Sequence, residues 1–208
     1  NGVIIDVGGC WGWHWRNLKA YRPDVKVVII DFVRENLFKA KTLLGGEINR
    51  SVFLVHGNAV DLNFPGNTFD GYWSVQCIQH IPDYKKVYEE AYRVLKKNSV
   101  LINYSLNYAL FIKFVFMVFK KNYTVEGEWD STKMYLRRMH KTEVEFARRL
   151  FKSKEEISFS EVLFHPELRF SKPGQKNNYL GKLDSILSSS LRVFSFFARQ
   201  KCIKLTKN

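Results

Sequence analysis

The sequence contains few residues that could hold a small fold together through disulfide or metal bonds. Its 208 residues include three cysteines, Cys10, Cys77 and Cys202. Their number and scatter exclude a disulfide framework and favour reduced thiols in the cytoplasm. Neither CxxC nor HExxH occurs, so we expect no zinc site and no other metal.

Long hydrophobic runs are missing as well. The most apolar stretch, residues 106–119 (LNYALFIKFVFMVF), contains Lys113. As a helix rising ~1.5 Å per residue it covers roughly 21 Å, short of the ~30 Å hydrocarbon core of a membrane. Residues 1–6 (NGVIID) have neither an initiator Met nor the layout of a signal peptide. We therefore expect a chain clipped at its start that works in the cytoplasm, with a place at the inner membrane surface left open.

Acidic residues are scarce relative to basic ones. The chain has 33 Lys and Arg against 20 Asp and Glu, a formal net charge of +13. Residues 1–104 carry 13 basic and 10 acidic side chains, net +3, whereas residues 105–208 carry 20 and 10, net +10. This excess in the second half favours an anionic partner, such as nucleic acid, a phosphorylated sugar or membrane headgroups. Solubility alone is the alternative explanation.

The first half of the chain alternates apolar runs of strand length with segments of helical spacing. The overall composition, 46% hydrophobic and 25% charged, is that of a globular protein. Runs that are apolar throughout predict parallel strands buried on both faces. We therefore predict a Rossmann-like α/β fold with a doubly wound, mostly parallel sheet. The expected strands are residues 3–7, 25–30, 52–56, 71–75 and 99–104, and the expected helices are 13–21, 35–44 and 83–96.

A different pattern begins after residue 104 and indicates an insert behind the fifth strand. A charged segment of helical spacing covers 130–154, and a partly alternating segment covers 156–164. Residues 192–205 are expected to supply a late edge strand. We expect one domain over residues 1–208, with a helical and aromatic cap at about 106–180 and a closing strand region at about 181–208.

The turn at residues 6–12 (DVGGCWG) is the most specific feature of the sequence. A dinucleotide-binding GxGxxG motif that starts at Gly8 would need glycines where Cys10 and Trp13 stand. The segment VIIDVGGCWG instead resembles the first motif of class I S-adenosylmethionine-dependent methyltransferases. Cys10 replaces the middle glycine of that family's GxGxG.

The resemblance extends over about residues 2–105. The segment VVIIDF ends near Asp31, where the family places an acidic residue, and residues 57–104 resemble its third to fifth strands. The closest likeness is to the subgroup that includes ubiquinone-biosynthesis methyltransferases. The resemblance implies an enzyme whose residues 1–105 bind S-adenosyl-L-methionine and release S-adenosyl-L-homocysteine.

The resemblance also implies which residues of the first loop and second strand meet the cofactor. Gly8, Gly9 and Gly12 let the backbone turn sharply and approach the methionine part. Asp6 is expected to orient the loop or to reach the cofactor's amino group through water. Asp31 is expected to accept hydrogen bonds from both ribose hydroxyls. Its alternative role is the N-cap of the following helix.

Further cofactor contacts are implied just after the second, third and fourth strands. Phe32 is expected against the adenine face. Asn58 and Ala59 match the family's Asp-Ala pair, and the Asn58 side-chain oxygen can still accept from the adenine amino group. Val75 is expected to offer its backbone carbonyl to the cofactor's amino group, with Gln76 beside it.

His80 is the candidate catalytic residue. The pair Gln79-His80 occupies the position of the family's usual His-His pair, near the reacting methyl group. We expect His80 to act as a base or a substrate contact, and the alternative is a structural hydrogen bond. His14 and Trp11 in the first loop are secondary candidates.

The insert is expected to select the methyl acceptor. We expect a small molecule, phosphorylated, glycan-type or lipid-linked and anionic, with peripheral membrane contact as an option and nucleic acid as a less favoured partner. An RNA methyltransferase and a non-catalytic S-adenosylmethionine-binding protein are the alternatives. The basic side chains between Arg137 and Lys154 are predicted to form a solvated helix face. The aromatic residues of the insert are predicted to be core rather than a lid, and they are Tyr108, Phe111, Phe114, Phe116, Phe119, Tyr123, Trp129 and Tyr135.

Overall fold

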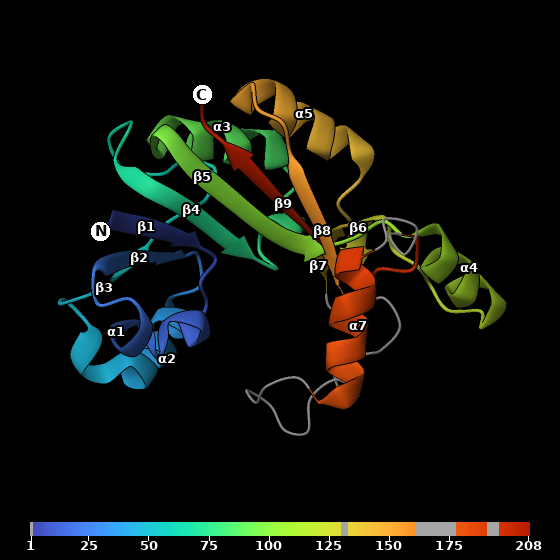
Figure 1. The fold of residues 1–208 in the computed structure, drawn as a ribbon, viewed down its shortest axis with the longest axis horizontal. Helices are drawn as coiled ribbons and strands as arrows, with labels where there is room; N and C mark the ends of the chain where they lie inside the picture. The colour runs from blue at the N-terminus through green and yellow to red at the C-terminus, as the bar shows by residue number, and fades with distance from the viewer. Residues whose placement is uncertain (1, 130–132, 161–177, 191–195) are drawn as a thin grey trace.

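A single seven-stranded sheet forms the centre of the molecule (Figure 1). The computed structural model describes residues 2–129, 133–160, 178–190 and 196–208. The strand order is β3-β2-β1-β4-β5-β9-β8. The first five strands run parallel, and β9 is antiparallel to both of its neighbours. The strands are β1 (Gly2–Val7), β2 (Val25–Asp31), β3 (Val52–His56), β4 (Phe69–Val75), β5 (Leu95–Leu106), β8 (Glu156–Ser160) and β9 (Gln200–Thr206). The predicted fold class is confirmed.

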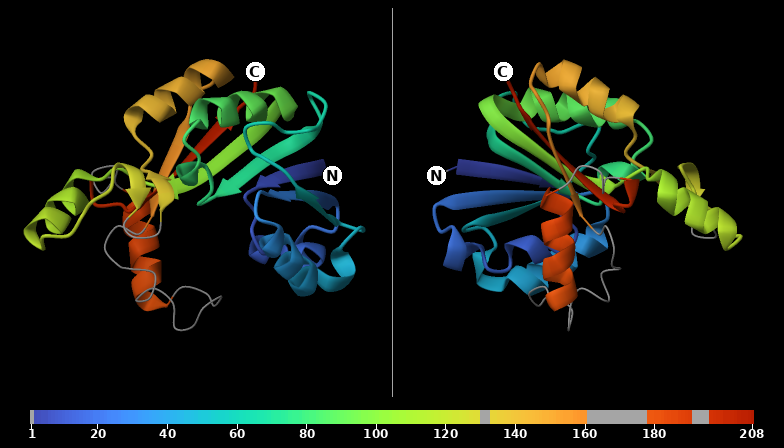
Figure 2. Two further views of the ribbon diagram at one scale, coloured as in Figure 1. Left: turned by 180° about the vertical axis from the view of Figure 1, so that it is seen from behind. Right: turned by 45° about the vertical axis from the view of Figure 1, so that its right-hand side comes forward.

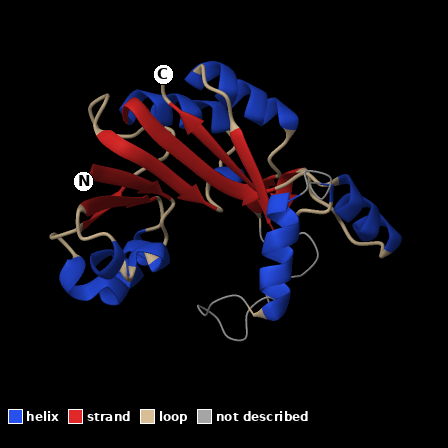
Figure 3. Cartoon of the chain, in the orientation of Figure 1, coloured by secondary structure: helices blue, strands red, loops and turns tan. Residues whose placement is uncertain are grey.

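Helices cover both faces of this sheet (Figures 2 and 3). On one face α1 (Leu18–Tyr21) and α2 (Arg34–Leu44) enclose an apolar cluster with β2 and β3. On the other face α3 (Tyr84–Val94) and α5 (Lys141–Phe151) enclose a larger cluster with β1, β4, β5 and β9. The first half of the chain also contains three short 3-10 helices, η1 (Trp13–Trp15), η2 (Gly45–Glu47) and η3 (Ile78–His80).

Local signals explain the position of α3. Asp83 is its N-cap, and its side chain accepts a hydrogen bond from the Lys86 backbone N–H at 3.2 Å. Val87, Ala91 and Val94 recur at helical spacing and are buried against the sheet. The helix thereby fixes the direction in which the chain leaves η3, at the end of β4.

Two predictions for the second half are wrong. Residues 134–137, which we expected within a helical segment, form strand β7 (Met134–Arg137), antiparallel to β6 (Glu126–Trp129). The late strand β9 does not lie at the edge of the sheet, because β8 pairs with its outer side. Residues 161–164 and 192–195 of the predicted segments lie outside the described residues.

The remaining helices of the second half extend away from the sheet. In the views of Figures 1 and 2, α4 (Leu110–Val118) and α7 (Tyr179–Ser190) project from the end of the sheet formed by β8 and β9. Phe111, Phe114 and Phe119 are exposed. The prediction that they belong to the core is therefore wrong.

Candidate active site

At two positions of the loop after β1, the backbone conformation and the close packing admit only glycine. Gly8 has φ 73° and Gly12 has φ 70°, both in the left-handed region. A Cβ at Gly8 would overlap the Cys77 side chain, and one at Gly12 would lie 2.6 Å from Leu44 Cδ1. A Cβ at Gly9, whose φ is not positive, would overlap the Asp6 carboxylate. The glycines thus let this loop pack closely against β1, α2 and η3.

Cys10 adopts a left-handed backbone conformation. Its φ is 51°, and the residue is exposed. The Cys10 backbone N–H donates to Asp31 Oδ2 at 3.0 Å. This hydrogen bond joins the loop after β1 to the end of β2.

The Asp31 carboxylate is buried and accepts three hydrogen bonds. Besides Cys10, the Val33 backbone N–H donates to Oδ1 at 2.9 Å, and Asn36 Nδ2 donates to Oδ1 at 3.1 Å. A carboxylate can accept about four hydrogen bonds, so one position on Oδ2 is left for another donor. The N-cap of α2 is Val33, so the alternative role of Asp31 as that N-cap is wrong.

Asp6 lies below the glycine loop and is almost fully buried. Its Oδ2 accepts a hydrogen bond of 2.6 Å from Trp15 Nε1. Burial raises the pKa of Asp6 from 3.8 to about 7, the Trp15 hydrogen bond opposes this rise, and the negative charge of Asp31 adds to it.

A pocket of about 110 Å³ opens between the glycine loop and the end of β4. Of the predicted cofactor residues, Asp6, Gly8, Gly9 and Val75 line it. The other lining residues are Cys10, Trp11, Trp13 and His14. Trp13 was not among our candidates, although three tryptophans within five residues after a glycine turn could have indicated it. Burial lowers the pKa of His14, and the Arg16 charge lowers it further.

The residues predicted to meet adenine lie along the exposed ends of β2 and β3. Phe32 is 71% exposed and its ring centroid lies 6.3 Å from that of His56. Asn58 is exposed, and its side-chain oxygen accepts from the Val60 backbone N–H at 3.2 Å. The Ala59 side chain is buried in the core. Phe32 and Asn58 therefore present an open surface rather than a closed pocket.

His80 belongs to a chain of side-chain amides. Gln79 Nε2 donates to Gln76 Oε1 at 2.8 Å and to His80 Nε2 at 3.1 Å. His80 Nδ1 lies 2.8 Å from the Tyr135 carbonyl oxygen, which can only accept. A ring with its proton on Nδ1 satisfies both contacts, so both ring nitrogens are engaged in hydrogen bonds within the protein. Gln76 extends the chain to Gln200 on β9 at 2.8 Å. This geometry favours the structural alternative for His80.

Comparison with known proteins identifies the first half of the chain. The family described as "Methyltransferase domain" matches residues 5–103. A 2-methyl-6-phytyl-1,4-hydroquinone methyltransferase from Oryza sativa is 35% identical over 99 residues, 47% of this chain and 28% of that protein. A demethylmenaquinone methyltransferase from a Geobacillus strain is 28% identical over 123 residues, 54% of this chain and 53% of that protein. The chain thus spans between about a quarter and about half of these relatives.

Solved structures share the fold over almost the whole chain. A SAM-dependent methyltransferase from Thermotoga maritima aligns with a TM-score of 0.66 at 19% identity, covering 100% of this chain and 83% of that one. Phosphoethanolamine N-methyltransferase 2 from Haemonchus contortus, in complex with S-adenosyl-L-methionine, aligns with a TM-score of 0.66 at 18% identity, covering 99% and 48%. Residues 5–103 are thus similar to the methyltransferase family, and the chain shares the fold of solved S-adenosylmethionine-dependent methyltransferases. The resemblance predicted from the sequence is confirmed over residues 5–103.

The described residues contain neither a metal-binding cluster nor a membrane-spanning helix. Among residues 2–129, 133–160, 178–190 and 196–208, no three His, Cys, Asp or Glu side chains are grouped so that they could hold a metal ion. Within the same ranges, no helix has both the length and the hydropathy needed to cross a bilayer.

Proposed function

We propose that this protein transfers a methyl group from S-adenosyl-L-methionine to a small-molecule acceptor. The observation that carries this proposal is the 3.0 Å hydrogen bond from the Cys10 backbone N–H to Asp31 Oδ2. It unites the glycine loop and the carboxylate at the end of β2 at one edge of the sheet, where ligands of doubly wound folds bind. Residues 1–105 would form the cofactor-binding half, and residues 106–180 the acceptor side.

The residues at this edge fit the cofactor. The pocket of about 110 Å³ is smaller than the ~300 Å³ typical of a whole ligand site, so it would hold only the amino-acid end, near Asp6, Gly8 and Val75. The ribose would meet Asp31 Oδ2, whose remaining position suits one hydroxyl. A second hydroxyl would have to replace the Asn36 or Cys10 donor. Adenine would lie on the open surface at Phe32 and Asn58.

Positioning rather than proton transfer would be the main task of this chain. When bound, the cofactor supplies a methyl carbon activated by a sulfonium, which requires neither a metal nor a covalent enzyme intermediate. The acceptor must be held in line behind that carbon. Since both His80 nitrogens are occupied, we propose that His80 positions the β6–β7 hairpin over η3. An acceptor that is already anionic needs no base.

We propose a lipid-linked, anionic acceptor. The relatives named above act, by their names, on a phytyl hydroquinone and on demethylmenaquinone. The insert of this chain combines exposed aromatic side chains with the +10 charge of residues 105–208, which suits a molecule with an apolar tail and a negative head. With such an acceptor, the protein would act in the cytoplasm, in peripheral contact with the inner membrane surface. RNA is less well supported as the acceptor, because stacking of bases on aromatic side chains would not explain the exposed aliphatic side chains of α4.

The test is calorimetric titration with S-adenosyl-L-methionine and S-adenosyl-L-homocysteine, with NAD as the negative control. We expect dissociation constants on the order of micromolar for both, and at least about tenfold weaker binding by Asp31→Ala, since the hydrogen bond from a ribose hydroxyl to a charged group is lost. Asp24→Ala is the matched control. Asp24 immediately precedes β2 at its opposite end and pairs with Arg22, so this variant should bind like the wild type.

Two outcomes would contradict the proposal. Wild-type protein that binds neither compound would show that Cys10 and Trp11 close the pocket. Tight cofactor binding without methylation of any acceptor in a cell extract would favour the non-catalytic alternative.

A further inference from the structure

Helix α4 exposes an apolar surface that the rest of the described protein does not cover. None of its nine residues is buried. The exposed fractions are 56% for Leu110, 46% for Phe111, 55% for Phe114, 66% for Met117 and 57% for Val118. In both views of Figure 2 the helix extends away from the body of the molecule. Soluble monomers rarely expose a contiguous apolar patch of this kind, and such a patch marks an interaction site.

The two sides of α4 have different surroundings. Ile112, Val115 and Phe116 are half-buried, and the Phe116 ring lies 5.4 Å from that of Tyr123. Tyr123 in turn accepts, through its hydroxyl, a hydrogen bond from the Ala109 backbone N–H at 3.1 Å. These contacts attach the helix to the protein through one side, and at its flank the Phe111 ring centroid lies 4.6 Å from that of Phe197.

The other side of α4 is a continuous apolar face. At about 100° per residue, Leu110, Phe114, Met117 and Val118 fall on one side, flanked by Phe111 and Lys113. All six are exposed. A large apolar face on a helix too short to cross a bilayer is typical of a helix that lies in the plane of a membrane surface.

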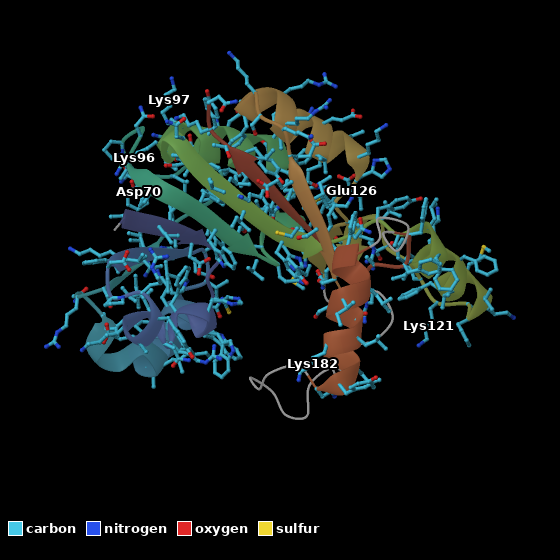
Figure 4. The ribbon with its side chains drawn as sticks, in the orientation of Figure 1. Asp70, Lys96, Lys97, Lys121, Glu126 and Lys182 are labelled. Atoms are coloured by element: carbon cyan, nitrogen blue, oxygen red, sulfur yellow. The ribbon has the colours of Figure 1, made fainter. Side chains whose placement is uncertain are left out.

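The charged residues around α4 indicate what kind of partner its apolar face binds. Lys113, Lys120 and Lys121 are exposed, and residues 107–125 contain no Asp or Glu. Figure 4 shows Lys121 beside the free end of the helix. A second copy of the chain docked through this face would bring the same lysines together, and their repulsion opposes such a dimer. Anionic headgroups complement both the lysines and the net charge of +13.

We propose that α4 docks this protein on an anionic lipid bilayer. The helix begins four residues after the end of β5, which is parallel to β4. It therefore leaves the same edge of the sheet at which β1, β2 and β4 end beside the pocket. Docking would bring this edge close to the membrane, where a lipid-linked acceptor resides. The choice of acceptor rests on the proposed function, whereas membrane binding does not.

Sedimentation with vesicles tests this docking without any cofactor. We expect the protein to bind phosphatidylcholine vesicles that contain phosphatidylglycerol, and to bind them less at high salt. Phe114→Ser with Met117→Ser should weaken binding by about tenfold or more, because two apolar side chains no longer leave water. Lys120→Ala with Lys121→Ala should weaken binding to the anionic vesicles by about tenfold and leave binding to pure phosphatidylcholine unchanged.

Matched controls lie elsewhere on the surface. Tyr21→Ser with Phe38→Ser removes two aromatic side chains that are 79% and 70% exposed. Lys26→Ala with Lys97→Ala removes two exposed lysines from the opposite edge of the sheet, and Figure 4 shows Lys97 far from α4. Both control proteins should bind vesicles like the wild type. Circular dichroism would verify that every variant is folded.

Three results would overturn the docking proposal. The α4 variants could bind vesicles as tightly as the wild type. The wild type could fail to bind vesicles and instead form a dimer, which the double variant Phe114→Ser with Met117→Ser no longer forms. It could instead bind an RNA oligomer through Lys120 and Lys121 without any dependence on Phe114. The two proposals fail separately, since Asp31→Ala should lose cofactor binding and keep vesicle binding.

Discussion

At the scale of single residues, the conformation of the glycine loop follows from its packing. Gly8 and Gly12 are tightly enclosed by Cys77 and Leu44, so the fold alone explains why no side chain is present there. Cys10 lies on the open side of the same loop and adopts φ 51° at a modest cost. A Cys in the middle of the motif is therefore compatible with the conformation of this loop.

The buried carboxyl group of Asp6 should make stability depend on pH. The folded protein holds this proton up to about pH 7, whereas the unfolded chain loses it near the ordinary value of 3.8. Between these values the folded state binds more protons, so the free energy of unfolding decreases as the pH rises. Asp6→Asn keeps an acceptor for Trp15 Nε1 and removes the titration. We predict that the free energy of unfolding of this variant, taken relative to that of the wild type, rises by about 2 kcal/mol between pH 5 and pH 8.

Urea unfolding at the two pH values measures this difference. Asp70→Asn is the control, because the Lys96 hydrogen bond lowers the pKa of Asp70 and places its titration below this range. Its stability relative to the wild type should be the same at both pH values. If Asp6→Asn shows no change with pH either, Asp6 is ionised in the folded protein at pH 5.

The contacts of individual site residues were predictable where the residues lie in one turn or at the ends of neighbouring parallel strands. Asp6, Gly8 and Gly9 belong to one turn, and the end of a neighbouring strand supplies Val75, so the topology brings them together. His80 is different. Its partner Tyr135 comes from a hairpin 55 residues away, and no local pattern encodes that contact. Trp13 was missed because bulky aromatic residues are not a feature of the motif that we recognised.

At the scale of secondary structure, the two halves of the chain differ in how clearly their elements are encoded. In the first half β1, β2 and β3 are short, largely apolar runs that begin or end beside Gly or Asp, and β2 and β3 begin at the predicted residues 25 and 52. The segment 134–137 has no Gly, Asn or Asp at its ends that would mark it as a strand. Its pairing with β6 decides its conformation, although its apolar residues have helical spacing. The place of β9 between β5 and β8 is decided by pairing between distant residues, which periodicity does not report.

A buried ion pair connects β7 to α5. Arg137 Nη1 donates to Glu143 Oε2, and both side chains are almost fully buried. Glu143 Oε1 also accepts from the Tyr88 hydroxyl at 2.9 Å. We predict that Glu143→Ala lowers the free energy of unfolding by about 3–5 kcal/mol, because it leaves the Arg137 charge buried without a partner.

Replacing both partners should cost much less. Arg137 Nε and Nη2 are buried without hydrogen-bond partners in the described structure, so Arg137→Met with Glu143→Leu removes unsatisfied donors together with the ion pair. Chemical denaturation of the single and double variants measures the difference. Glu145→Ala is a control on the same helix, since Glu145 pairs with Lys141 and Arg149, whose side chains are exposed to solvent. A double variant as unstable as Glu143→Ala would show that the pair itself provides most of the stability.

At the scale of the whole molecule, the chain presents two distinct surfaces at one edge of its sheet. The first is the glycine-loop site formed by β1, β2 and β4, and the second is the outer face of α4, which follows β5. The family resemblance covers residues 5–103 and so includes the first surface alone. This explains why the cofactor could be predicted from the sequence, whereas the acceptor could not.

Hydrogen exchange should separate these two surfaces in one protein. Adding S-adenosyl-L-methionine at 100 times its dissociation constant should stabilise the folded state by about 2.7 kcal/mol. The resulting local protection should appear in peptides around Gly8–Gly12 and Asp31–Val33, where the ligand would contact backbone amides and restrain them. Anionic vesicles should instead protect Leu110–Val118, since those amides would leave water. Peptides from α3 serve as the control for global stabilisation. If the cofactor protects α4 as strongly as the glycine loop, α4 closes over the site as a lid, and its apolar face belongs to the acceptor rather than to the membrane.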